Sequence, residues 1–97
     1  MATYIMLINY TQQGIESIKE SPDRLDAAKE LLQSLGGELR DFYLTMGNYD
    51  IVAMIEAPDD QTVARFVLAA GSQGNVRTTT LKAFSETEFR EIVQSLP

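Results

Sequence analysis

The sequence predicts an α+β domain in which the elements follow the order β-α-β-β-α-β, with one more helix at the C-terminus. Short apolar runs alternate with segments whose apolar residues recur every three or four positions. Glycine, proline and helix-capping residues stand at the boundaries between these segments. The chain has 97 residues and a mass of 10.8 kDa. That is enough for one hydrophobic core and too little for two, so we expect residues 1–97 to form a single domain.

The first strand and the first long helix occupy the N-terminal third of the chain. Residues 4–10 are mostly apolar and predict a strand, after which Thr11 suits the N-cap of a short helical turn. Ser21 and Pro22 predict a helix start, with a serine cap and a proline at the first helical position. Apolar residues then recur at helical spacing, at Leu25, Ala28, Leu31, Leu32 and Leu35. The two glycines at 36–37 predict the end of this helix.

Two strands and a hairpin follow. Residues 38–45 and 50–57 are the predicted strands, and Gly47-Asn48 suits a two-residue hairpin loop between them. This loop pairs Tyr43 with Val52, Asp41 with Met54 and Leu39 with Glu56, and the pairing places alternate side chains on opposite faces. One face is mostly apolar and is expected to contact the helices. The other mixes apolar and ionisable side chains, namely Asp41, Tyr43, Thr45, Asp50, Val52, Met54 and Glu56.

The C-terminal part repeats the pattern of a helix and a strand. Asp59 or Asp60 is the expected cap of a helix that Gly71 closes. The apolar stripe of this helix is Val63, Phe66, Val67 and Ala70. Residues 76–83 are rich in threonine and predict the last strand. Residues 85–88 read Ser-Glu-Thr-Glu, a capping box, and begin a helix with the apolar stripe Phe89, Ile92, Val93 and Leu96.

This order of elements is the ferredoxin-like arrangement, whose antiparallel sheet has the strand order 4-1-3-2 and helices on one face. The central strands would be residues 4–10 and 50–57, which are the two continuous apolar runs. A strand with one wet face should instead alternate apolar and polar residues. Both faces therefore need cover, and a second copy of the chain would supply it. We expect a homo-oligomer of at least two copies that associates through the open sheet face.

The candidate binding residues lie on that open face. Tyr43, Thr45 and Asp50 combine a phenol, a hydroxyl and a carboxylate beside the hairpin, and Arg77 on the last strand could hold an anion. These four residues predict a site for a small carboxylate or phosphate. Asp50 could be a general base, or it could simply bond backbone N–H groups of the turn. Arg77 could equally protect an exposed sheet edge.

Composition narrows the chemistry further. The chain has no cysteine and no histidine, so we expect no disulfide, no thiol nucleophile, no transition-metal site and no bound cofactor. The pair Asp59-Asp60 could hold a hard cation, but a helix cap explains it better. The net charge of −6 and the pI near 4.4 argue against nucleic acid and anionic membranes as partners. The N-terminal residues resemble neither a secretory signal nor a membrane span, so we expect a cytoplasmic protein.

Several sequence fragments, taken in order, resemble the GYD domain family. They are Ala2 to Ile15, the stretch Ser-Pro-Asp-Arg at 21–24, Leu-Gly-Gly at 35–37, Gly-Asn-Tyr-Asp-Ile-Val at 47–52, Glu-Ala-Pro-Asp-Asp at 56–60 and Gly-Asn-Val-Arg-Thr at 74–78. The family's Gly, Tyr and Asp are spread here over four positions, with Asn48 after the glycine. The resemblance implies a small bacterial or archaeal ferredoxin-like domain of the dimeric α/β-barrel kind, with no settled activity and no agreed catalytic residues.

Three functions therefore remain open at this point. We favour a non-enzymatic homo-oligomeric module that binds a small metabolite, such as an anion, at the intersubunit sheet face. A cofactor-independent oxygenase or isomerase of the dimeric α/β-barrel type is the first alternative, by analogy of fold. A purely structural interaction subunit is the second. Whether the protein is an enzyme stays undecided by the sequence.

Overall fold

The computed structural model describes residues 1–97, and its elements follow the predicted order. The strands are β1 (Ala2–Tyr10), β2 (Glu38–Leu44), β3 (Ile51–Ala57) and β4 (Val76–Ala83). The helices are α1 (Gln12–Glu16), the 3-10 helix η1 (Ile18–Glu20), α2 (Ser21–Ser34), α3 (Asp60–Ser72) and α4 (Glu86–Gln94). None of these helices is both long and apolar enough to cross a membrane.

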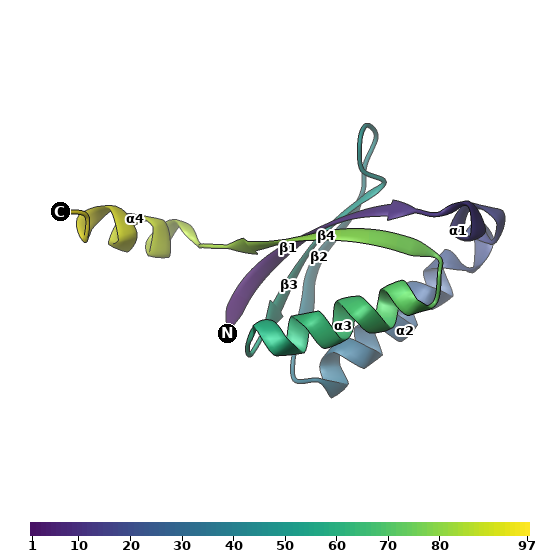
Figure 1. Cartoon of the computed structure of the whole chain (residues 1–97), viewed down its shortest axis with the longest axis horizontal. Helices are drawn as coiled ribbons and strands as arrows, with labels where there is room; N and C mark the ends of the chain where they lie inside the picture. The colour runs from purple at the N-terminus through teal and green to yellow at the C-terminus, as the bar shows by residue number, and fades with distance from the viewer.

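The four strands form one antiparallel sheet in the order β2-β3-β1-β4, which confirms the predicted topology. Helices α2 and α3 lie on the same side of this sheet (Figure 1). The core forms between them and the sheet, where side chains of β1 and β3 meet Leu32 of α2 and Phe66 of α3. Along β3, Ile51, Ala53, Ile55 and Ala57 are buried while the residues between them are only half-buried. The alternation identifies the helix-covered face and the open face.

The predicted pairing of β2 with β3 is right near the hairpin and wrong at the far end. Tyr43 pairs with Val52 as expected, but Leu39 pairs with Ile55 rather than with Glu56. A register irregularity between Leu39 and Asp41 inserts one extra residue, Arg40, into β2. Such a bulge turns Leu39 to the helix side, where it packs against the core.

The hairpin loop is also longer than the sequence predicts. The strands end at Leu44 and resume at Ile51, so the loop spans residues 45–50 rather than Gly47-Asn48 alone. The hydroxyl of Thr45 donates to the carbonyl of Tyr49 at 2.6 Å, inside the loop. Asp50 lies outside β3, and its backbone N–H donates to the carbonyl of Ile8 on β1 at 3.0 Å.

Helix ends follow the predicted chemistry with two exceptions. Thr11 caps α1, Asp59 caps α3, and the capping box begins α4. Ser21, however, is the first residue of α2 and not its cap, because η1 runs directly into the helix. Its hydroxyl instead forms a hydrogen bond of 2.7 Å with the hydroxyl of Tyr10.

The second exception is the end of α3. The helix continues through Gly71 to Ser72, and Gly74 takes the left-handed conformation with φ +83°. Glycine adopts this conformation without steric cost, so Gly74 ends the helix and begins the approach to β4.

Helix α4 is the one long element without a place in the body of the molecule. It continues the line of β4 beyond the sheet, so that the C-terminus lies far from the other helices (Figure 1). No residue of α4 is buried. Its apolar stripe is exposed, with Phe89, Ile92, Val93 and Leu96 each at least 44% accessible.

Candidate functional site

Three of the four predicted site residues lie in one row across the end of the sheet. Asn9 of β1 pairs with Arg77 of β4. On its other side, Asn9 accepts a hydrogen bond through Oδ1 from the backbone N–H of Asp50 at 3.1 Å. The backbone N–H of Thr45 in turn donates to the carbonyl of Asp50 at 2.8 Å. The row therefore runs Thr45, Asp50, Asn9, Arg77.

Tyr43 and Arg77 are the exposed members of the predicted site. Tyr43 lies two residues before Thr45 on β2, and 61% of its surface is accessible. Arg77 is exposed and forms no ion pair, which leaves its guanidinium free to meet an anion. A cleft at these residues stays a prediction.

Asp50 is half-buried, and its carboxylate is already engaged. Its Oδ2 accepts a hydrogen bond of 2.9 Å from the backbone N–H of Tyr10. The sequence suggested that Asp50 could bond N–H groups of its own turn, and the structure instead has it bond the end of β1. The side chain thereby fixes the hairpin loop to the central strand, and one carboxylate oxygen has no hydrogen bond.

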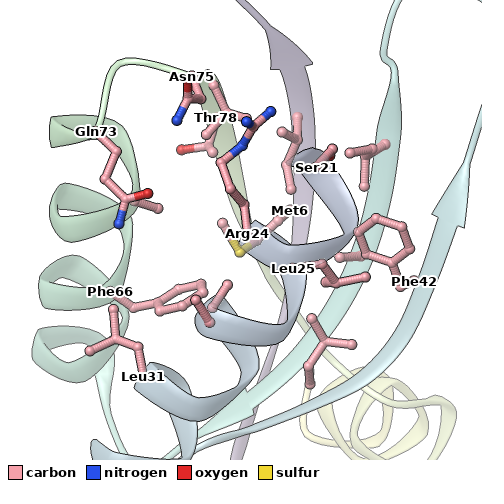
Figure 2. A pocket seen from close by; sticks show the side chains of 18 of the residues that line it. Met6, Ser21, Arg24, Leu25, Leu31, Phe42, Phe66, Gln73, Asn75 and Thr78 are labelled. Atoms are coloured by element: carbon pink, nitrogen blue, oxygen red, sulfur yellow. The ribbon is translucent and has the colours of Figure 1, made fainter. Parts of the chain in front are cut away.

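A cavity of about 360 Å³ lies on the opposite, helix-covered face, between α2, α3 and the sheet. Its walls are mostly apolar and come from every layer of the fold, including Met6, Leu25, Leu31, Phe42 and Phe66. None of Tyr43, Thr45, Asp50 and Arg77 lines it. Figure 2 shows Leu25, Leu31, Phe42 and Phe66 in the lower part of this cavity, with polar side chains such as Ser21, Asn75, Thr78 and Arg24 above them.

Arg24 is the charged residue of this cavity. The residue is half-buried, and its side chain is 21% exposed. Its Nη1 donates to the carbonyl and the hydroxyl of Ser17 at 3.2 and 3.1 Å, and Nη2 donates to the carbonyl of Gly14 at 3.4 Å. The carboxylate of Glu20 is 4.0 Å away and largely exposed. Arg24 therefore forms hydrogen bonds with the C-terminal end of α1, and its guanidinium still has N–H groups that could bind a further acceptor.

A set of close contacts ties α1 to the start of β4 at the same end of the cavity. The backbone N–H of Thr11 donates to the carbonyl of Asn75 at 3.0 Å, and the Thr11 hydroxyl donates to the carbonyl of Gly74 at 2.6 Å. Gln13 donates through Nε2 to the side-chain oxygen of Asn75 at 3.0 Å. Only glycine fits at position 14, because the Cβ of any other residue would overlap the carbonyl oxygen of Asn75.

A second polar cluster lies at the far end of the sheet. The hydroxyl of Tyr4 donates to Oδ1 of Asp60, and Nζ of Lys82 lies 3.5 Å from the same oxygen. The hydrogen bond to Asp60, together with burial, raises the pKa of Tyr4 to about 12. The same hydrogen bond holds the pKa of Asp60 below its usual value. The phenol stays protonated at neutral pH, so it keeps donating its hydrogen bond to Asp60. This hydrogen bond connects β1 to the start of α3.

Arg24 and the cavity beside it were not predicted from the sequence. A single arginine in a helix gives no signal unless the cavity is known. A weaker signal was present in the small residues Ala28, Ala53 and Ala70, which face the cavity from α2, β3 and α3. They lie at apolar core positions where larger side chains would fill the space.

Comparison with known proteins agrees with this fold. The chain is 38% identical over 84 residues to a protein of Thermus thermophilus named glutamine synthetase and cystathionine beta-lyase binding protein, covering 86% of this chain and 88% of that one. A crystal structure from the same organism superposes with a TM-score of 0.56 at 28% identity, covering 88% of this chain and 95% of that one.

Two further solved structures share the fold at low identity. They are MtbAldR, with a TM-score of 0.68 and 15% identity, and a feast or famine regulatory protein from M. tuberculosis complexed with L-methionine, with a TM-score of 0.66 and 14% identity. Each match covers 88% of this chain, which spans about half the length of each of those two chains, 52% and 51%. They support a ferredoxin-like fold.

The family itself is identified along nearly the whole chain. The GYD domain matches residues 4–93, from the first strand to the C-terminal helix. The match includes the hairpin that carries Gly47, Tyr49 and Asp50. The chain therefore belongs to the GYD domain family.

Proposed function

We propose that this protein is a non-catalytic binding module that works as a homo-oligomer and associates with other proteins. The observation that carries the proposal is the uncovered apolar face of the sheet. Ile5, Leu7, Val52 and Met54 are only half-buried there, and Leu81 is 45% exposed. Contiguous apolar surface of this kind marks an interaction site. Two sheets packed face to face, as in a dimeric α/β barrel, would cover it.

The shape of the single chain supports the same proposal. Its Cα radius of gyration is 14.7 Å, against about 12.5 Å for a compact chain of this length. Helix α4 adds to this extension because it stands clear of the sheet (Figure 1). The apolar stripe of α4 and the open sheet face are both uncovered in one chain, and both would be buried if α4 packed on a second copy.

The Thermus thermophilus relative suggests what the module associates with. That protein is named for binding glutamine synthetase and cystathionine beta-lyase, and it is 38% identical over most of both chains. We propose that this protein likewise binds enzymes, and that it acts on them through contact rather than through a reaction of its own.

A small anionic metabolite is the second candidate ligand. Thr45, Asp50 and Arg77 share a row at one end of the open face, and Arg77 has no ion-pair partner. In a face-to-face assembly this row would lie at the edge of the interface. Arg77 would hold the carboxylate or phosphate, and the Thr45 hydroxyl would contribute a further contact.

The assembly is tested by a charge on the open face. Met54→Asp should dissociate the oligomer to single chains of 10.8 kDa, because an unpaired carboxylate would be buried in the interface. Sedimentation equilibrium measures the change. The matched control is Ala64→Asp on the exposed side of α3, which should leave the oligomer intact. A wild-type protein that is monomeric at micromolar concentration would contradict the proposal.

Partner binding is tested separately with purified enzymes. Calorimetry should detect binding of the wild-type protein to the glutamine synthetase or the cystathionine beta-lyase of its own organism.

The metabolite site is tested with Arg77→Ala and with inorganic phosphate as the probe, because this substitution does not disturb the apolar interface. Loss of phosphate binding in Arg77→Ala would support the anion site. Equal phosphate binding by the wild-type protein and by Arg77→Ala would refute it.

A further inference from the structure

We propose that the cavity between α2, α3 and the sheet is a binding site for an amphipathic monocarboxylic acid. The aliphatic chain of the ligand would lie among the apolar walls, and its carboxylate would pair with Arg24. This site is separate from the open sheet face, since the residues that line it face the helices. It therefore adds a function to the proposed assembly and does not depend on it.

The size of the cavity is the first argument. Its volume of about 360 Å³ falls in the range of about 300–1,000 Å³ that small-molecule sites occupy. Protein interiors are close-packed and hold few voids larger than a water molecule. The cavity is partly open to the surface, and it is large relative to a core in which only 12 of the 97 residues are buried. An apolar ligand in it would add contacts to this core.

Small side chains on two helices and one strand leave this space open. Ala28 on α2, Ala53 on β3 and Ala70 on α3 all line the cavity. Each lies on the core-facing side of its element, among larger side chains such as Leu31 and Phe66. The space thus comes from small side chains at core positions.

The polar end of the cavity specifies the head group. Arg24 lines it together with Ser21, Gln73, Asn75 and Thr78, whose labelled side chains surround the upper part of the cavity in Figure 2. No hydrogen bond uses the side-chain amide nitrogens of Gln73 and Asn75 as donors. Guanidinium and amide N–H groups are donors to which a carboxylate forms hydrogen bonds.

Neighbouring charges limit the head group to one negative charge. Arg24 also lines a second, polar hollow, which Glu16, Glu20 and Asp23 share with it. These carboxylates, and the net charge of −6, would repel a dianion such as a phosphate monoester. A monocarboxylate that enters from the apolar side meets the guanidinium with less repulsion.

The test uses octanoate as the probe, with octanol and octyl phosphate as comparison ligands of the same chain length. Calorimetry should show octanoate binding about tenfold more tightly than octanol, which lacks the charge-assisted contact with Arg24. Octyl phosphate should also bind more weakly than octanoate, because the neighbouring carboxylates repel its dianion. Arg24→Gln should lose about tenfold in octanoate affinity and leave octanol binding unchanged. Amide chemical-shift changes should fall on residues around Ala28, Ala53 and Ala70.

A variant that fills the cavity keeps the test decisive if Arg24→Gln folds poorly. Ala70→Leu should abolish binding of both octanoate and octanol while raising the melting temperature of the free protein. Ala64→Leu, on the exposed side of the same helix, should bind octanoate as the wild type does. The inference is overturned if octanoate does not bind, if Ala70→Leu binds it normally, or if the shift changes map to Val52 and Met54 on the open face.

Discussion

Tyr4 and Asp60 show how one hydrogen bond fixes the place where a helix meets the sheet. Tyr4 is buried at 3% exposure on β1, and its hydroxyl reaches the first residue of α3. Asp59 at the same helix end accepts hydrogen bonds from the backbone N–H and the hydroxyl of Thr62, both at 2.8 Å. The N-terminus of α3 is thus held by its own capping residue and by a side chain from the sheet.

The Tyr4 phenol makes stability depend on alkaline pH. Because the pKa of Tyr4 rises from 10.0 to about 12 on folding, the folded state holds this proton more tightly than the unfolded state does. The corresponding stability is fully present below pH 10.0 and should be lost as the pH rises towards about 12. Urea unfolding across this range measures the loss. Tyr4→Phe should show a smaller decline, and parallel curves for the two proteins would contradict the assignment.

Asp50 shows what the sequence could and could not specify about the candidate site. The position of this residue beside the hairpin was predictable from the Gly-Asn turn and the apolar run that follows it. Its acceptance of a hydrogen bond from Tyr10 was not, because the two residues are 40 positions apart and meet only through the pairing of β1 with β3. Arg24 was unpredictable for the same reason, since its role depends on the cavity that α2 and α3 leave between them.

Among the elements, the topology was predictable and the local irregularities were not. The two apolar runs identified β1 and β3 as the central strands, and capping residues marked most helix starts. The bulge at Arg40 lies in a stretch without glycine or proline, so no local residue signals it. Its cause is tertiary: Leu39 gains contact with the core, and Nε of Arg40 lies 3.4 Å from Glu56 across the strand pair.

The junction between α1 and β4 is a close backbone contact and gives a prediction. Gly14→Ala would place a Cβ against the carbonyl oxygen of Asn75, so the two backbones must separate. We expect a loss of about 2 kcal/mol in the free energy of unfolding, as for overpacking of a rigid contact. Chemical denaturation measures it. Gly71→Ala is the control, because a Cβ there meets nothing within 4 Å and alanine favours a helix. Equal stability of the wild type and Gly14→Ala would contradict this account.

At the scale of the whole molecule, the chain is long and thin, with extents of 52 × 31 × 18 Å. The sheet has helices on one side only, and α4 extends past its edge (Figure 1). Both features leave apolar surface in contact with water in a single chain, which is unfavourable in proportion to its area. The proposed assembly removes this cost by using the same surfaces as contacts.

The part that α4 takes in the proposed assembly can be tested by mutation. Ile92→Glu places a charge in the apolar stripe of α4 and should weaken self-association about tenfold or more, since the charge would be buried at the contact. Sedimentation equilibrium over a concentration series gives the constants. Gln94→Glu adds the same charge on the other side of the helix and should have little effect. If Ile92→Glu associates as tightly as the wild type, α4 takes no part in the contact between copies.

The isolation of α4 also has a consequence for its own secondary structure. The helix has nine residues, and its capping box satisfies only the first turn. Helices shorter than about 12–15 residues are marginal in water when nothing packs against them. Its helicity should therefore be coupled to whatever covers its apolar stripe. Diluting the protein until the copies separate should unwind α4, so the far-ultraviolet circular dichroism of this chain should change with its concentration, while that of a chain ending at Phe84 should not.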